Sequence, residues 1–125
     1  MIENKTKRHF CIFDELYSGT NPYEAVASAF GFIKYLNTYE NVDLLLTTHY
    51  SKLCKLLEAE NIQNMHMKIE KKYDVGKEVN SMKYLYKLGK GISSVKGGIK
   101  VLQDLDYPIE IINDTKYIIN IDVEY

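Results

Sequence analysis

The sequence has no tryptophan, two cysteines, two prolines and a single arginine among its 125 residues. Cys11 and Cys54 are far apart and lack CxxC spacing, which argues against a disulfide framework and a cysteine-based zinc site. No apolar stretch approaches the roughly 18–20 residues of a membrane span, and no secretory signal is visible at the N-terminus. These absences predict a soluble, intracellular protein without a membrane partner.

The sequence also lacks an excess of either positive or negative charge. The 16 lysine and arginine residues face 17 aspartate and glutamate residues, so the net charge is −1 and no overall excess points to nucleic acid. A hydrophobic content of 46% with 26% charged residues is ordinary for a soluble globular domain. A chain of this length can form one domain with a modest core.

The first part of the chain predicts a strand–helix–strand unit. Residues 10–13 are all apolar and fit a buried strand, and residues 42–47 predict a second one. Between them, Asn21 can cap a helix that begins at Pro22. Such a unit pairs its strands in parallel through a right-handed crossover, which predicts an α/β fold. The expected core face of the helix comprises Val26, Ala29, Phe30, Ile33 and Leu36.

The second part predicts a helix, a hairpin and a helical pair. Residues 51–60 should form the helix. Alternating apolar residues at Met65, Met67 and Ile69 predict a hairpin strand with His66 exposed on its outward side. Its connection should hold Asp74, Gly76 and Asn80, and the glycine- and serine-rich residues 89–98 should end the sheet region. Two short helices should follow, with apolar faces formed by Ile99, Leu102, Leu105, Ile111, Ile112, Ile118 and Ile119.

Asp14 and Glu15 are the first candidates for chemistry. For an arbitrary Asp-Glu pair the usual interpretation is two solvated carboxylates. Here four apolar residues precede the pair and place it at the carboxyl end of a buried strand, the edge where open α/β sheets bind ligands. Asp14 would hold Mg²⁺ through a water, and Glu15 would polarise the water that attacks a terminal phosphate.

His49 ends the second apolar run and should lie beside Glu15, where its imidazole could contact a γ-phosphate or orient the water. A single histidine after a strand is more often structural. Gly19, Thr20 and Asn21 form a turn and helix start whose free N–H groups can bind an anion or a partner, or simply cap the helix. Residues 90–98 look like a phosphate loop but lack its Gly-Lys-Ser/Thr ending.

These residues together resemble a known family, the MutS mismatch-repair ATPases. The Walker B motif and D-loop of that family are similar to Phe13-Asp14-Glu15-Leu16-Tyr17-Ser18-Gly19-Thr20-Asn21. The switch histidine segment is similar to Leu46-Thr47-Thr48-His49-Tyr50. The paired strands that follow resemble residues 64–67 and 84–88, and residues 91–108 resemble the stretch that leads into the C-terminal helix-turn-helix.

The resemblance implies half of an ABC-type P-loop NTPase domain, over residues 1–90, followed by a helix-turn-helix dimerisation segment over residues 91–125. It implies ATP and Mg²⁺ as ligands, with Asp14 serving the metal, Glu15 hydrolysis and His49 the γ-phosphate. The D-loop residues Gly19, Thr20 and Asn21 would cross toward the second subunit of a homo- or heterodimer. Double-stranded DNA would be bound by domains that this chain does not contain. The dimerisation residues would include Ile99, Leu102, Ile111 and Ile112.

The sequence departs from the family pattern at several points, and these departures leave two alternative functions to consider. The Walker A loop and the signature segment are absent from this sequence, so we expect a fragment of a longer ATPase. Tyr17-Ser18 replaces the Gly-Arg or Phe-Arg that commonly precedes Gly-Thr. One alternative is another ABC-type DNA-repair ATPase, against which Leu16 and the Gly-Thr-Asn turn argue. The other is a non-catalytic dimerisation or regulatory module derived from the same domain.

Overall fold

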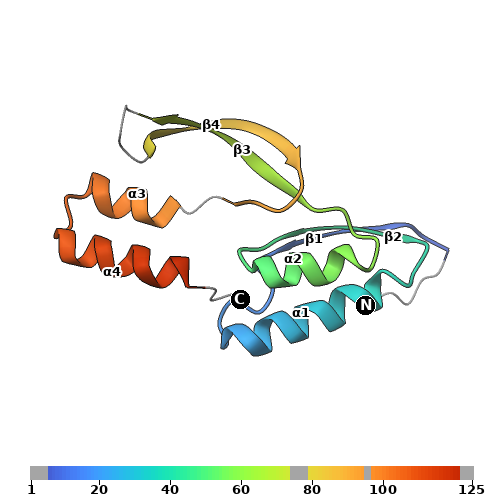
Figure 1. Cartoon of the computed structure of the whole chain (residues 1–125). Coiled ribbons are helices and arrows are strands. Elements are labelled where there is room, and N and C mark those ends of the chain that lie inside the picture. Colours follow the sequence, from blue (N-terminus) through green and yellow to red (C-terminus); the bar gives the residue numbers. More distant parts are fainter. Residues whose placement is uncertain (1–5, 74–78, 95–96, 122–125) are drawn as a thin grey trace. The chain divides into compact units, whose positions relative to one another are not determined.

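The computed structural model of the protein describes residues 6–73, 79–94 and 97–121. These residues form an α/β structure in two compact units, which divide between Gln63 and Asn64 (Figure 1). The functional division expected at residue 90 remains a prediction. The elements are, in order, β1 (His9–Asp14), α1 (Pro22–Leu36), β2 (Val42–Thr47), α2 (Ser51–Glu58), β3 (Met65–Tyr73), β4 (Val79–Lys90), α3 (Gly97–Asp104) and α4 (Ile109–Asn120).

The first unit contains the predicted strand–helix–strand arrangement. β1 pairs with β2 in parallel, from His9 opposite Val42 to Asp14 opposite Thr47. α1 forms the crossover and begins as expected at Pro22, with Asn21 as its N-cap. Because the pairing is parallel and in this register, both strands end at the same edge of the sheet.

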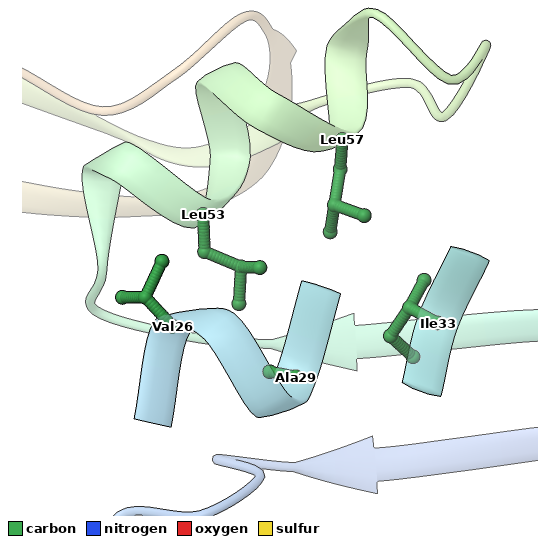
Figure 2. Packing of buried hydrophobic residues seen from close by; sticks show 5 residues of the cluster. All are labelled: Val26, Ala29, Ile33, Leu53 and Leu57. Carbon is green, nitrogen blue, oxygen red and sulfur yellow. The ribbon is translucent and has the colours of Figure 1, made fainter. Parts of the chain in front are cut away.

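The core of the first unit lies between the two helices and one face of the sheet. Figure 2 shows Leu53 and Leu57 of α2 pointing toward α1. Phe13, Leu44 and Leu46 of the sheet pack against this cluster. Burial of these side chains fixes α1 and α2 against the strands that carry the candidate site. The buried members of the cluster are Val26, Ala29, Ile33, Leu53 and Leu57.

The opposite face of the sheet is exposed, so the prediction of fully buried strands was wrong. Phe10 and Ile12 of β1 are each 66% exposed, and Leu45 of β2 is 51% exposed. Both strands alternate between half-buried and exposed residues. Parallel strands that are apolar on both faces are normally covered on both. Within the described residues, α1 and α2 cover a single face, so an apolar surface formed by Phe10, Ile12 and Leu45 stays open.

The second unit begins with the predicted hairpin, in which β3 and β4 pair antiparallel. The phase of His66 was predicted wrongly, because its side chain is half-buried while Met65 and Met67 are exposed. Two features hold the imidazole inward: its Nδ1 donates a hydrogen bond to the Gly91 carbonyl at 3.0 Å, and Gly89 opposite leaves room for the ring. A Cβ on Gly89 would lie 3.0 Å from Nε2 of His66.

The ends of β4 also differ from the expectation. The strand includes Asn80, which was expected in the connection, and continues to Lys90, beyond the start of the segment that was expected to end the sheet. Asp74 and Gly76, the other residues expected in the connection, lie outside the described residues.

The two C-terminal helices are confirmed. Of the residues predicted to mediate dimerisation, Ile112 is 6% exposed and Ile111 is 44% exposed, while Ile99 and Leu102 are half-buried. Ile118, about two helical turns beyond Ile111, is 54% exposed. The apolar face of α4 is therefore wide enough to bury one stripe and expose another. Within the described residues, no helix combines the length and the apolar character needed to cross a bilayer.

Candidate functional site

The candidate site lies at the edge where β1 and β2 both end. Asp14 and Thr47 are paired residues of the parallel register, so their side chains project on the same face of the sheet. The Thr47 hydroxyl donates a hydrogen bond of 2.5 Å to Oδ1 of Asp14. The contact holds one carboxylate oxygen and leaves Oδ2 of Asp14 available, because a carboxylate can accept several bonds.

Glu15 follows Asp14 directly, and its backbone turns away from the direction of β1. Its backbone N–H still donates to the Thr47 carbonyl at 3.0 Å, but its φ is +53°, in the left-handed region that non-glycine residues rarely adopt. Tyr17, two residues later, has a φ of +61°. Left-handed residues concentrate where a backbone must re-aim a side chain, and here they turn the chain sharply after the first carboxylate.

His49 lies directly beside Glu15, as the sequence predicted. Nε2 of His49 is 2.6 Å from Oε1 of Glu15, so the imidazole N–H donates to the carboxylate. The His49 side chain is 90% exposed and that of Glu15 43% exposed, which leaves both accessible to a ligand. The proximity is confirmed, and the roles of the two residues in hydrolysis stay predictions.

Thr47 was missed by the sequence analysis as a site residue. The signal that could have identified it was the register: two apolar runs of similar length, paired in parallel from their first residues, place the fifth residue after His9 opposite the fifth after Val42. Without that register, Thr47 is simply the last residue of a strand.

Magnesium can be accommodated by this arrangement. Mg²⁺ in nucleotide sites usually binds one or two protein oxygens and completes its shell with water and phosphate oxygens. Asp14 and Thr47 offer a carboxylate and a hydroxyl side by side. No cluster of three or more His, Cys, Asp and Glu side chains suited to a metal occurs among the residues described here. A metal at this edge would therefore need phosphate or water oxygens as well.

The predicted D-loop is joined to the start of α1. Oδ1 of Asn21 accepts a hydrogen bond of 3.1 Å from the Glu24 backbone N–H, and the Thr20 hydroxyl donates to Glu24 Oε2 at 3.2 Å. A Cβ built on Gly19 would meet nothing within 4 Å. Gly19, Thr20 and Asn21 are all exposed, so they are accessible to a second chain, although contact with a partner stays a prediction.

Replacement of the N-cap should destabilise the first unit measurably. Asn21→Ala removes the acceptor for the Glu24 N–H and is expected to lower the free energy of unfolding by about 1 kcal/mol. Urea denaturation followed by circular dichroism measures the change. Asn21→Asp keeps an acceptor oxygen and should stay within a few tenths of a kcal/mol of the parent protein. Equal losses for both variants would show that the cap does not stabilise α1.

Cys54 on α2 is a poor candidate nucleophile. Burial of its thiol raises the pKa above the usual value for cysteine, so the thiolate fraction at neutral pH is reduced. In a Cys11→Ala background, we expect Cys54 to react with a disulfide reagent more slowly in the folded protein than in 6 M urea at the same pH. The folded-state rate should rise with pH to a midpoint above that of the unfolded chain. Equal rates in both states would contradict this burial effect.

The amino-acid sequence is similar to known proteins over nearly its whole length. Residues 1–121 match the family described as MutS domain V. The DNA mismatch repair protein MutS of Aquifex pyrophilus is 31% identical over 120 residues, which are 95% of this chain and 13% of that protein. MutS of Acholeplasma laidlawii is 32% identical over 116 residues, covering 91% of this chain and 13% of the relative. Human MutS protein homolog 4 is 28% identical over 120 residues, again 13% of its length. The chain thus spans about an eighth of each of these relatives.

Proposed function

The chain belongs to the MutS family, as a domain V, and on that premise we propose that it supplies the hydrolytic half of an ATPase site coupled to a DNA mismatch-repair transaction. The observation that carries the proposal is the convergence of Asp14, Glu15 and His49 at one edge of a parallel sheet. In α/β proteins, ligands bind at the carboxyl ends of the strands. Two adjacent carboxylates and an imidazole there fit metal-assisted hydrolysis of a phosphoanhydride.

Asp14 and Thr47 would hold the magnesium ion. Asp14 keeps one oxygen free of the Thr47 hydrogen bond, so it can face the metal directly or through a water. The bound ion would supply neutralisation of the charge on the β- and γ-phosphates.

Glu15 would act as the base for the attacking water. Its carboxylate can accept a proton from the water as the water's oxygen attacks the terminal phosphate. His49 donates to the same carboxylate, so it would orient Glu15 before ATP binds. A γ-phosphate placed nearby would compete for the imidazole N–H, which gives His49 a means to sense the nucleotide. Release of Glu15 from His49 would then coincide with ATP binding.

The rest of the ATPase domain would cover the open face of the sheet. The 125 residues contain no Gly-x-x-x-x-Gly-Lys-Ser/Thr sequence, so the phosphates must be bound by another polypeptide segment. Phe10, Ile12 and Leu45 present the apolar surface against which such a segment would pack, in the P-loop NTPase architecture that the family resemblance implies.

Dimerisation would use the exposed stripes of the C-terminal helices. Ile111 is exposed with Ile118 on α4, and Val101 and Leu105 are exposed on and directly after α3. Ile112 is buried, so it would support the dimer indirectly by packing the two helices together. The partner would be a second MutS-family subunit, identical or different.

A domain graft tests the proposal. In the graft, residues 1–121 replace the matching segment of Aquifex pyrophilus MutS, so that the chain receives a complete upstream region. We expect the graft to bind Mg-ATP within about tenfold of the parent MutS, whereas the isolated chain should bind it weakly because it lacks a phosphate loop. A folded graft that binds no ATP would overturn the proposal.

The alternative function is a non-catalytic dimerisation module, to which the exposed Ile111 and Ile118 of α4 would contribute. ATP hydrolysis distinguishes the two functions, whereas dimerisation does not, because both functions include a dimer. A graft that dimerises and binds ATP but never hydrolyses it would support the module. Tight Mg-ATP binding by the isolated chain would exclude it.

A further inference from the structure

The β3–β4 hairpin concentrates positive charge in a chain that is almost neutral overall. Its described residues, 64–73 and 79–90, include six lysines and one carboxylate, Glu70. The chain as a whole has 16 basic and 17 acidic residues, so the basic excess of this segment is local. Among the hairpin lysines whose side chains the structure describes, none forms an ion pair with a carboxylate of the described residues. The lysines with exposed side chains are Lys68, Lys71, Lys83, Lys87 and Lys90.

Two exposed tyrosines accompany these lysines: Tyr84 is 60% exposed and Tyr86 is 83% exposed. Because side chains alternate between the two faces of a strand, the register places Tyr84 on the same face of the hairpin as Lys71 and Lys90. Exposed aromatic rings flanked by cations suit a single-stranded nucleic acid, because bases stack on the rings while phosphates meet the cations. An acidic protein surface would use the lysines but would have no need of exposed rings.

A bulge in β4 displays Tyr86. The register moves from Met67 opposite Leu88 to Ile69 opposite Tyr84, so three residues of β4 span the place of one residue of β3. Tyr86 is the central one and has a φ of +54°, which is costly for an aromatic residue. Bulges re-aim side chains next to functional sites. Here the bulge holds the most exposed aromatic side chain in the described part of the protein.

We propose that the β3–β4 hairpin binds single-stranded nucleic acid, with its lysines on the phosphates and Tyr84 and Tyr86 against the bases. The hairpin belongs to the second unit and shares no residue with the Asp14, Glu15 and His49 site, so the proposed binding requires neither ATP nor hydrolysis. It goes beyond the ATPase function proposed above, and either proposal can fail without the other.

Fluorescence anisotropy with a labelled 20-nucleotide oligothymidylate tests the proposal on the full chain. We expect binding at 50 mM KCl that weakens with salt, at a slope of about −2 to −3.5 for three to five phosphate contacts. Lys71→Gln combined with Lys90→Gln, on the face that carries Tyr84, should reduce the magnitude of that slope by about 1.4. The same charge change on α2, Lys52→Gln combined with Lys55→Gln, is the matched control and should leave affinity and slope unchanged.

The tyrosine variants separate stacking from charge. Tyr86→Leu should weaken binding at least fivefold without changing the salt slope, and Tyr86→Phe should restore it, because stacking needs the ring and not the hydroxyl. Circular dichroism confirms folding of each variant. Absence of binding at 50 mM KCl would overturn the proposal. So would equal affinity for a matched duplex or for polyglutamate, or an α2 control that weakens binding as much as the hairpin variant.

Discussion

Glu15→Gln in the MutS graft is expected to lower ATP turnover by about 10²–10⁴-fold while leaving ATP affinity nearly unchanged. Glutamine keeps the shape of the side chain and can still accept the hydrogen bond from His49, which is 2.6 Å from Oε1 in the parent protein. It cannot take the proton of the attacking water, and loss of a positioned base costs rate on this scale. Steady-state phosphate release and equilibrium nucleotide binding measure the two quantities separately.

The matched control is Glu40→Gln, which removes the same charge from an exposed residue between α1 and β2. Its turnover should equal that of the unmodified graft. If Glu15→Gln hydrolysed ATP at the unmodified rate, Glu15 would not be the base, and the adjacent left-handed turn would need another explanation.

Leu53→Ala is expected to lower the free energy of unfolding of the chain by about 2–5 kcal/mol. The side chain is 1% exposed and packs between α1 and α2, so truncation both removes apolar contact and leaves a cavity. A loss of this size is a large part of the total stability of a small domain. Urea titration monitored by circular dichroism provides the measurement.

Leu56→Ala, on the same helix, controls for helix propensity because the substitution is identical. Leu56 is 38% exposed, so its truncation should cost less than about 1 kcal/mol. Equal losses at the two positions would show that the core between α1 and α2 is not packed as described. A large loss confined to Leu53 would support it.

The sequence predicted well those features that depend on local chemistry. Asn21 and Pro22 marked the beginning of α1 because capping and a fixed proline φ act within a few residues. The proximity of His49 and Glu15 followed from parallel pairing, which brings the ends of both strands to one edge. The family assignment rested on the same short motifs.

Features that depend on distant surroundings were not predictable. Phe10 and Ile12 belong to an apolar run, and such a run fits burial on both faces whether or not a second layer of helices is present. His66 is turned inward because Gly89 leaves space on the neighbouring strand, and a single strand pattern does not reveal its partner's register. The bulge at Tyr86 has the same origin, since only the pairing with β3 exposes the extra residues.

Single-turnover phosphate release by the graft tests the central claim most directly, because it reports the chemistry of the Asp14–Glu15–His49 site itself. With the graft in excess over Mg-ATP and at a concentration that binds all of it, we expect a rate of phosphate release within about tenfold of that of the parent Aquifex pyrophilus MutS. A graft that binds Mg-ATP as tightly as the parent and releases no phosphate above the Glu15→Gln variant would contradict it.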